Sequence, residues 1–367
     1  MPPLVSVIVN SYNYVRYVGT SIESALGQDY ERIEVIVVDD GSTDGSADVV
    51  AACGDRARTI LKRNGGQASA LNAGFSVSNG DIVIFVDCDD LLYPHAVSSV
   101  VAAWTPECAK VQYRLAIVDA DGRLTGGSFP AAQVVLPSGD LVPMIAAVGG
   151  YPCPVTSGNA YARQVLEELM PIPEDEFRLS ADGYLNPLAP FYGTVISLQD
   201  ELGAYRLHGS NRWLGLTSNA DLLRHIEHDL LKQRHVLATA RARGRQMPTD
   251  LAIRDAGHVL HRLSHLRLDP ERHPIPGDTR RGLTLAGIRA MLRSPELAGA
   301  ERLLYAGVII AVAAVPRKLA RPVIDWSLAS RPRPALLRLG RRALRRIRFP
   351  RRRATSSMPP PGAETRG

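Results

Sequence analysis

Three carboxylates that follow a short apolar run are the residues of this chain with the clearest chemical potential. The run, Ile82 to Val86, is too short for a stable helix and rich in β-branched side chains, which is typical of a buried strand in a parallel sheet. Asp87, Asp89 and Asp90 follow it directly, where open α/β sheets place their ligands. Carboxylates packed this closely are costly to ionise unless a cation offsets their charge, and oxygen ligands suit Mg²⁺ or Mn²⁺. We therefore predict Mn²⁺ or Mg²⁺ on these three residues; an acidic turn that caps the next helix is the alternative.

A second acidic strand end lies upstream. The apolar run Ile33 to Val38 ends in Asp39 and Asp40, and the small, turn-forming residues GSTDGS follow. Their spacing is similar to that of an EF-hand loop, which needs a bidentate Glu at its twelfth position. Ala51 occupies that position, so we exclude a calcium loop and expect both carboxylates to point out of the sheet edge.

The elements that position these residues alternate between strand and helix. Strands are predicted at Leu4 to Val9, Ile33 to Val38, Thr59 to Lys62 and Ile82 to Val86, each followed by a loop and, in most cases, a helical pattern. This alternation predicts an α/β fold with a mostly parallel central sheet flanked by helices and a nucleotide at its carboxyl edge. Neither GxxxxGK[ST] nor a strand-linked GxGxxG occurs, so a P-loop and a dinucleotide fingerprint are both excluded.

The pattern changes after Pro94. Alternating residues before the turn Asp121-Gly122 predict a hairpin, and two further short strands are expected at 194–198 and 203–206. A long helix over residues 220–243 carries histidines at HxxH spacing, but no acid-plus-water pattern accompanies them, which argues against a metal site there.

Composition and charge limit the class of protein. The chain has 367 residues, 45% of them hydrophobic, and four widely spaced cysteines without a CxxC pair, which favours a globular protein in a reduced, cytoplasmic setting. We expect the N-terminus to be the first strand and not a secretory leader. Residues 317–367 contain 15 Lys and Arg and two acids, a net charge of +13. Because the whole chain has a net charge of +6, residues 1–316 have a net charge of −7.

This basic end of the chain predicts a contact with an anionic surface. Leu303 to Pro316 is the most apolar run, but its fourteen residues fall short of the roughly 20 that span a bilayer. With the basic segment after it, this run suggests peripheral attachment to an anionic membrane surface on the cytoplasmic face. Nucleic acid is not expected as a partner, because the basic residues lack interleaved aromatics.

Taken together, five segments resemble the inverting GT-A glycosyltransferases of family 2. They are VSVIVNSYNY, EVIVVDDGSTDGS, NGGQASALNAG, IVIFVDCDD and YRLHGSN, in that family's order and approximate spacing. The resemblance covers residues 4 to about 215. It implies a GT-A (Rossmann-like) glycosyltransferase domain over residues 1–215. From helical periodicity and charge alone, we expect a helical extension over 216–316 and a basic, partly disordered, membrane-proximal tail over 317–367.

The resemblance also assigns roles to individual residues. Asp87 and Asp89 match the outer positions of the family's DxD metal motif, and Asp90 extends it. Asp182 matches the general base of its ED motif, whose first acid is replaced here by Ala181. The residues that the resemblance places around the donor nucleotide-sugar are Asn10, Tyr12, Asp39, Asp40, Arg63, Gln67, Asn72, Asp87 and His208.

The implied reaction moves a sugar from a nucleotide-sugar donor to a hydroxyl of a glycan or lipid-linked glycan in cell-envelope or polysaccharide biosynthesis. A sugar hydroxyl is a poor nucleophile, so Asp182 would take its proton, while a metal on the DxD motif would stabilise the diphosphate leaving group. Two alternatives remain open at this point. One is transfer to a polyprenyl phosphate, which needs no base, and the other is a catalytically inert scaffold that binds nucleotides or glycans.

Overall fold

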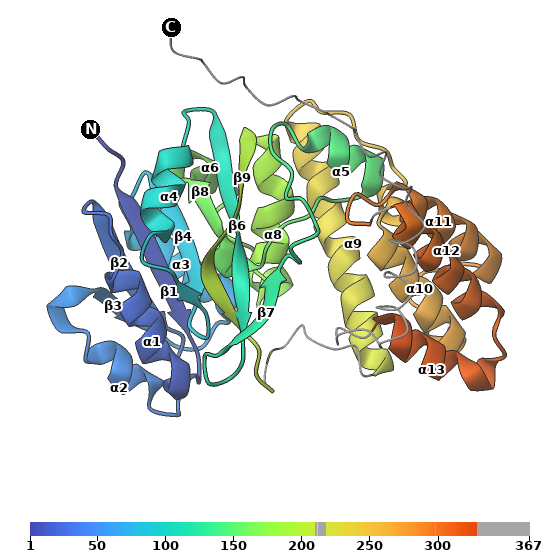
Figure 1. The fold of residues 1–367 in the computed structure, drawn as a ribbon, viewed down its shortest axis with the longest axis horizontal. Coiled ribbons are helices and arrows are strands. Elements are labelled where there is room, and N and C mark those ends of the chain that lie inside the picture. Colours follow the sequence, from blue (N-terminus) through green and yellow to red (C-terminus); the bar gives the residue numbers. More distant parts are fainter. Residues whose placement is uncertain (210, 212–217, 298, 329–367) are drawn as a thin grey trace, which may run out of the picture. The chain divides into compact units, whose positions relative to one another are not determined.

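The computed structural model describes residues 1–209, 211, 218–297 and 299–328, and residues 1–328 form one compact unit. Figure 1 shows the elements in chain order. The strands are β1 (Val5–Ser11), β2 (Ile33–Asp39), β3 (Arg58–Leu61), β4 (Ile82–Asp87), β5 (Leu91–Leu92), β6 (Cys108–Val118), β7 (Leu124–Phe129), β8 (Asn159–Ala162) and β9 (Thr194–Arg206). The helices are α1 (Val15–Leu26), α2 (Ser46–Ala51), α3 (Gln67–Val77), α4 (Ala96–Ala103), α5 (Val142–Val148), α6 (Arg163–Leu169), α7 (Glu174–Phe177), α8 (Asp182–Leu188), α9 (Asn219–Ala242), α10 (Ala256–Leu268), α11 (Arg280–Arg293), α12 (Gly299–Ala314) and α13 (Arg317–Leu328).

The sheet has the strand order β3-β2-β1-β4-β8-β6-β9-β5, and β7 pairs with β6. Strands β3, β2, β1 and β4 are parallel, as the sequence predicts, whereas β8 runs antiparallel between β4 and β6. The register places Asn10 beside Asp87, and Ser11 beside Asp39. Because the carboxyl ends of parallel strands share one edge, the polar residues after three strands meet there.

Strand β1 shows how the sheet is covered on both faces. Val7 and Val9 pack with Ile22 of α1 in one buried cluster, while Ile8 packs with Leu71 of α3 in the other. Side chains alternate between the faces of a strand, so both faces of an unbroken apolar strand are buried, as is typical of parallel sheets.

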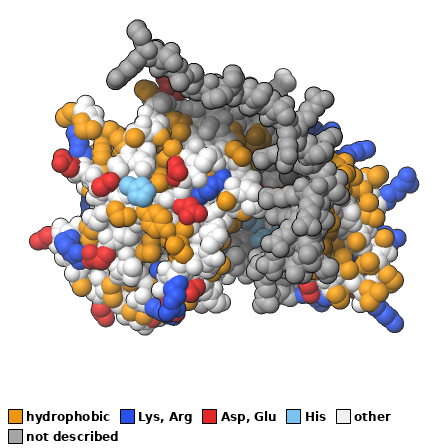
Figure 2. Space-filling model, in the orientation of Figure 1, with side chains coloured by type: hydrophobic (Ala, Val, Ile, Leu, Met, Phe, Trp, Pro, Cys, Tyr) orange, Lys and Arg blue, Asp and Glu red, His pale blue; other side chains and the backbone are white. Residues whose placement is uncertain are grey.

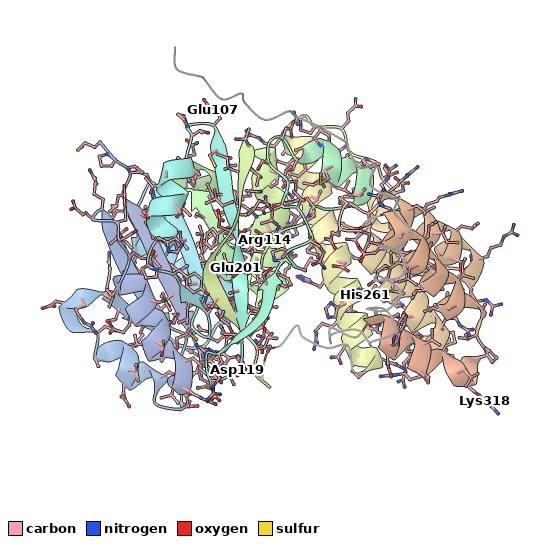
Figure 3. All side chains as sticks on the ribbon, in the orientation of Figure 1. Glu107, Arg114, Asp119, Glu201, His261 and Lys318 are labelled. Atoms are coloured by element: carbon pink, nitrogen blue, oxygen red, sulfur yellow. The ribbon has the colours of Figure 1, made fainter. Side chains whose placement is uncertain are left out.

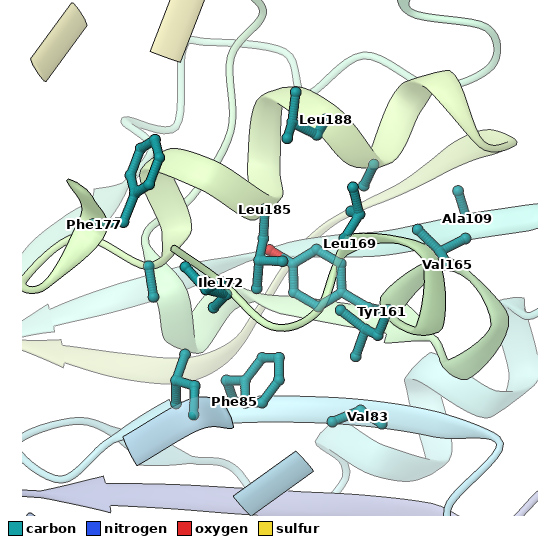
Figure 4. Close-up of a cluster of buried hydrophobic side chains, with 14 of the residues drawn as sticks. Val83, Phe85, Ala109, Tyr161, Val165, Leu169, Ile172, Phe177, Leu185 and Leu188 are labelled. Carbon is teal, nitrogen blue, oxygen red and sulfur yellow. The ribbon is translucent and has the colours of Figure 1, made fainter. Parts of the chain in front are cut away.

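The cluster around α3, α6 and α8 continues into the C-terminal region. Figure 4 shows Leu185 of α8 beside Tyr161 of β8, and Leu188 of α8 and Phe85 of β4 belong to the same buried cluster. Val236 of α9 is buried in the same cluster. This shared core places α9 directly against the helix that begins at Asp182.

Two sequence predictions about the later strands have different outcomes. The hairpin is confirmed, because β6 and β7 are antiparallel around the turn at Asp121 and Gly122. The prediction of two strands at 194–198 and 203–206 is wrong, because β9 is continuous over these residues. Register shifts in its pairing with β6 accommodate the polar residues between the two apolar pieces.

Helices α10 to α13 pack around a third buried cluster that includes Leu263, Ile309, Val312 and Ile324. Residues 317–328, predicted as part of the basic tail, form α13 and contribute to this core. Among the residues that the structure describes, no helix combines the length and apolar content that crossing a membrane requires. The predicted tail beyond Leu328 lies outside the described residues.

Candidate active site

A cavity of about 1280 Å³ opens at the carboxyl edge of the sheet. Polar strand ends line one side of it, and the start of α8, part of α9 and the segment before α12 line the other. Its lining residues come from within 10–17, 40–44, 64–70, 87–89, 148–156, 178–187, 205–211, 225–236, 254–257 and 290–296, with Ala120 and Phe129. Residues that are far apart in sequence therefore share one space, large enough for a nucleotide-sugar and part of a second substrate.

The Asp87 carboxylate, at the end of β4, is held by two amide side chains. Its Oδ1 accepts hydrogen bonds from Nδ2 of Asn10 at 2.8 Å and from Nε2 of Gln67 at 2.7 Å. Burial, and then the charge of Asp89, raise the pKa of Asp87 to about 6, although the two hydrogen bonds oppose this rise. A nearby cation would stabilise the ionised form of such a carboxylate.

Asp89 contacts the segment that follows β9. Its Oδ2 lies 2.9 Å from Nε2 of His208. The imidazole stacks on Tyr17 with ring centroids 5.2 Å apart and meets the edge of Tyr14 at 5.3 Å. His208, which the family resemblance places near the donor, thus lies beside Asp89 of the DxD segment.

Asp90 has a different environment from its two neighbours. It is 1% exposed and does not line the cavity. Its Oδ2 accepts from Oγ of Ser157 at 2.6 Å, and its Oδ1 accepts from the backbone N–H of Arg206 at 3.1 Å. Both oxygens therefore join β4 to neighbouring segments, and the structure does not support the prediction that Asp90 is a metal ligand.

The carboxylates of Asp39, at the end of β2, and Asp40, directly after it, organise loops beside the cavity. Oδ1 of Asp39 accepts hydrogen bonds from the backbone N–H groups of Gly41 and Ser42. Asp40 lines the cavity and accepts from Nζ of Lys62 at 2.7 Å and from the N–H of Gly66 at 2.6 Å. These bonds shape the loop that follows β3 and leads into α3.

Asp182 stands at the start of α8 and lines the same cavity as Asp87. Its Oδ1 accepts from the N–H of Gly183 at 2.9 Å and from Oγ of Ser180 at 3.3 Å. Burial raises the pKa of Asp182, while the Gly183 N–H, the charge of Lys232 and the Ser180 hydroxyl act against this rise. A carboxylate with a raised pKa is a better proton acceptor at neutral pH than an ordinary aspartate.

Gln67 links the two sides. While its Nε2 donates to Asp87, its Oε1 accepts from the backbone N–H of Ala181 at 3.0 Å. Ala181, which replaces the first acid of the motif, is fully buried. The Gln67 side chain therefore connects the DxD segment to the residue before the candidate base.

The histidines of α9 contact separate partners. Nε2 of His228 lies 3.0 Å from Oγ of Ser180, and Nε2 of His235 lies 2.5 Å from Oε2 of Glu176. The ring of His225 lies 5.1 Å from that of His261. Their HxxH spacing therefore reflects three different packing contacts.

The side of the cavity formed by α9, α10 and the segment before α12 carries several charges; we call it the helical wall. Its charged residues are Asp229, Lys232, Arg254, Asp255 and Glu296.

Asp229 is the centre of a network of charged and imidazole side chains in the helical wall. Nζ of Lys232 lies 2.6 Å from Oδ1 of Asp229. Oδ2 of Asp229 is in turn 3.3 Å from Nδ1 of His258 and 3.7 Å from Nδ1 of His261, which is labelled in Figure 3. This network joins α9 to α10 behind the cavity.

The structure brings most of the predicted site residues together. Four of them, Asp39, Arg63, Asn72 and Asp90, do not line the cavity. Arg63 is exposed and outside the cavity. Asn72 donates to the carbonyl of Ile172 at 3.0 Å and accepts from its N–H at 2.8 Å, so it holds α3 to the segment before α7. The predicted residues that line the cavity are Asn10, Tyr12, Asp40, Gln67, Asp87, Asp89, Asp182 and His208.

Sequence reasoning missed Ser180, His228 and Lys232. Ser180 lies two residues before Asp182, so its closeness in the sequence to the predicted base could have identified it. For the two residues of α9 no local pattern distinguishes a cavity-lining position from an ordinary helix face, because only the packing of α9 on α8 brings them to the site.

Two of the three predicted metal ligands, Asp87 and Asp89, suit a divalent metal. Among the residues that the structure describes, no group of three or more His, Cys, Asp or Glu side chains is arranged to hold a metal ion. Proteins usually bind Mg²⁺ through one or two carboxylates together with substrate phosphates. Asp87 and Asp89, which both line the cavity, match that pattern.

Comparisons with known proteins identify the family of this chain. The model of the family described as "Glycosyl transferase family 2" matches residues 6–129. An uncharacterized glycosyltransferase of Nostoc sp. (strain PCC 7120) is 37% identical over 220 residues, which is 58% of this chain and 68% of the relative. An uncharacterized glycosyltransferase of Rickettsia typhi is 42% identical over 95 residues, which is 26% of this chain and 30% of that protein.

A solved structure has a similar fold. S. aureus TarS, residues 1–349 in complex with UDP-GlcNAc, superposes with a TM-score of 0.50 at 16% sequence identity. The superposition covers 89% of this chain and 89% of that chain. The predicted GT-A fold, with its helical C-terminal region, is thereby confirmed.

Proposed function

Because this chain belongs to glycosyl transferase family 2, we propose that it transfers a sugar from a nucleotide-sugar donor to a hydroxyl group, with inversion of the anomeric centre. One observation carries this proposal. Asp87, Asp89 and Asp182 line a single cavity, and Gln67 bonds both to Asp87 and to the backbone N–H of Ala181, the residue before Asp182. Carboxylates for the leaving group and for the attacking hydroxyl are thus available in one cavity.

Asp182 is the proposed general base. Its burial raises its pKa, and its Oδ1 is occupied by Gly183 and Ser180, so Oδ2 takes the proton of the acceptor hydroxyl. The oxygen then attacks the anomeric carbon from the face opposite the diphosphate. An α-linked donor would give a β-linked product.

The leaving diphosphate is the proposed partner of the DxD segment. Mn²⁺ or Mg²⁺ held by Asp87 and Asp89 would supply positive charge against the developing charge of the diphosphate. Asn10 and Gln67 orient Asp87, and His208 orients Asp89. Asp90 has no part in this proposal, because both its oxygens are engaged elsewhere.

The donor nucleotide is proposed to occupy the side of the cavity formed by the ends of β1 and β2. Tyr12 lines this side with 45% of its surface exposed, and its ring is available to contact the base. Asp40 and the loop that it holds line the same side. Neither Arg63 nor Asn72 is included, since both lie outside the cavity.

We propose a glycan or lipid-linked glycan of the cell envelope as acceptor, with the protein on the cytoplasmic face of the membrane. The support comes from α12 and α13. Leu303, Ile310 and Leu319 are 68%, 50% and 57% exposed, next to the exposed cations Arg317 and Lys318. Figure 2 shows hydrophobic and basic side chains interspersed on this end of the molecule. Such a surface fits an anionic lipid headgroup region.

A panel of nucleotide-sugars, each with and without Mn²⁺, tests the donor side. We expect one donor to raise the thermal unfolding midpoint only with metal present, since a ligand stabilises the folded state that binds it. The anomeric configuration of the product, read by NMR, tests inversion. A product that keeps the donor's configuration would contradict the proposed mechanism.

A further inference from the structure

We propose that Arg178 is a positioning residue, which holds the loop over residues 64–67 (the donor loop) against residues 178–182 (the base segment), the segment that contains Asp182. The inference rests on the proposed function, because it concerns how the donor and the base are placed relative to each other. It is carried by the contacts of Arg178, which lines the cavity but lies outside the residues that the family model matches.

Arg178 reaches the donor loop with both terminal nitrogens of its guanidinium. Its Nη1 donates to the carbonyl of Gly65 at 2.8 Å, and its Nη2 donates to Oδ1 of Asn64. The backbone carbonyl of Arg178 also accepts from the N–H of Ala68, just after the loop, at 3.4 Å. A planar guanidinium holds two acceptors in a fixed relation to each other, whereas an ammonium group does not.

Gly66 shows how closely the donor loop and Arg178 fit together. Its φ of +92° lies in the left-handed region, which glycine adopts without strain. A Cβ atom added to Gly66 would collide with Cγ and with the backbone oxygen of Arg178. The contact therefore involves the backbone of both segments and is not limited to the end of a flexible side chain.

Asn64 transmits the contact with Arg178 to Asp40. Because Oδ1 of Asn64 accepts from Arg178, its Nδ2 is directed at Asp40, where it donates to Oδ2 and to the backbone carbonyl, both at 3.0 Å. The same carboxylate accepts from the N–H groups of Gly65 at 2.9 Å and Gly66 at 2.6 Å. Arg178 thus fixes the side chain that completes the attachment of the donor loop to Asp40.

The two segments meet a second time at Gln67. Its Oε1 accepts from the N–H of Ala181, and its Nε2 donates to Asp87. Arg178 and Ala181 therefore attach the base segment to the donor loop at two points, three residues apart in the sequence. A shift of the donor loop would displace Gln67, and with it the hydrogen bonds that orient Asp87 and the residue before the candidate base.

Helix α9 holds the base segment from another direction. Phe177, the residue before Arg178, is buried, and its ring lies 5.9 Å from that of His228 and 5.3 Å from that of His235. Glu176 pairs with His235 at 2.5 Å. Arg178 is therefore presented to the donor loop by a segment that packing keeps in place, which is what a positioning residue requires.

Hydrogen–deuterium exchange of the full chain tests the positioning without any substrate. We expect peptides that span residues 62–70 and 179–186 both to exchange at least fivefold faster in Arg178→Met than in the wild type, because the bonds that protect their N–H groups become easier to open. Arg56→Met is the matched control. Arg56 is also exposed and donates through both terminal nitrogens, to Glu23, but it lies outside the cavity.

Donor affinity tests the consequence for function. The probe is whichever of the UDP- and GDP-sugars binds the wild type most tightly with Mn²⁺. We expect Arg178→Met to raise its Kd about tenfold, with a urea midpoint equal to that of Arg56→Met. Arg178→Lys keeps the charge but not the pair of fixed donors, so its Kd should still rise at least threefold.

A double variant shows whether Arg178 acts through the donor loop. If it does, Asn64→Ala combined with Arg178→Met should have a Kd within about twofold of the weaker-binding single variant, because both changes release the same loop. Independent effects would multiply instead.

Four results would overturn the inference. They are wild-type exchange of either peptide in Arg178→Met, an unchanged Kd in that variant, wild-type affinity in Arg178→Lys, which would assign Arg178 a charge effect only, and multiplying effects in the double variant. A wild type that binds no donor would contradict the proposed function, and the exchange comparison would still decide whether Arg178 holds the loop.

Discussion

Nε2 of His228 lies 3.0 Å from Oγ of Ser180, so a residue of α9 supports the candidate base on α8. The Ser180 hydroxyl has one proton, which it donates to Oδ1 of Asp182. The His228 nitrogen must then be the donor to the Ser180 oxygen. A neutral imidazole suits this arrangement, and burial lowers the pKa of His228 to about 4.

Ser180→Ala should move the acid limb of the kcat profile to higher pH. A hydrogen bond to an ionised carboxylate lowers its pKa, and Ser180 acts on Asp182 in this direction. Its removal raises the pKa of Asp182, so more of the base is protonated and inactive at a given acidic pH. We expect kcat near pH 6 to fall about three- to tenfold.

Measuring kcat from pH 5 to 9 separates this role from a structural one. His228→Asn should shift the profile in the same direction as Ser180→Ala, whereas His235→Asn, which removes a contact with Glu176, should not. An equal loss at every pH would contradict a role through Asp182.

Asp182→Asn should abolish transfer to a hydroxyl while sparing the donor. A general base contributes about 10²–10⁴-fold to the rate, and an amide cannot take the proton. We expect kcat to fall at least a hundredfold and donor-induced thermal stabilisation to remain. Asp175→Asn, an exposed acid on α7, is the control. Full activity of Asp182→Asn would assign the base elsewhere.

Metal removal should destabilise the protein in a way that depends on Asp89. Binding to the native state adds about 2.7 kcal/mol at a concentration one hundred times Kd. We expect Mn²⁺ to raise the unfolding midpoint of the wild type, EDTA to reverse it, and Asp89→Asn to abolish the response. Asp48→Asn, exposed on α2 and outside the cavity, should respond normally. An undiminished response of Asp89→Asn would place the metal elsewhere.

Asn72→Ala should reduce stability and leave the donor KM unchanged. Its side chain makes two hydrogen bonds with the backbone of Ile172, and leaving such groups unpaired costs about 1–3 kcal/mol. Urea denaturation measures the loss. A large rise in the donor KM without loss of stability would instead support the donor contact that the family resemblance implies.

Replacing exposed apolar residues of α12 should weaken binding to anionic vesicles. Deleting residues 302–367 would also remove the buried Ile309 and Val312, so point changes are the sharper test. We expect Leu303→Glu with Ile310→Glu to lower partition onto phosphatidylglycerol vesicles at least tenfold. Leu124→Glu on β7, 69% exposed, is the control. Unchanged partition would exclude this surface.

Much of the fold and part of the site are predictable from the sequence, because the signals are local. Apolar runs that end in Asp39 and Asp87 define strands and the edge at which their carboxylates emerge. The order of five short segments identifies the family and, with it, Asp182 as the candidate base. In contrast, Asp90 and Asn72 carry the same local signals as residues that line the cavity, yet their side chains form hydrogen bonds with distant segments and lie outside it.

By itself, the sequence determined the strand and helix alternation, the family, and the three carboxylates Asp87, Asp89 and Asp182 as candidates for the chemistry. Only the tertiary structure decided what surrounds them. The packing of α9 against α8 places His228 beside Ser180 and brings Lys232 close enough for its charge to act on Asp182. The physical reason is that strand periodicity and turn chemistry act over a few residues, whereas the shape and charge of a cavity depend on contacts between segments far apart in the chain.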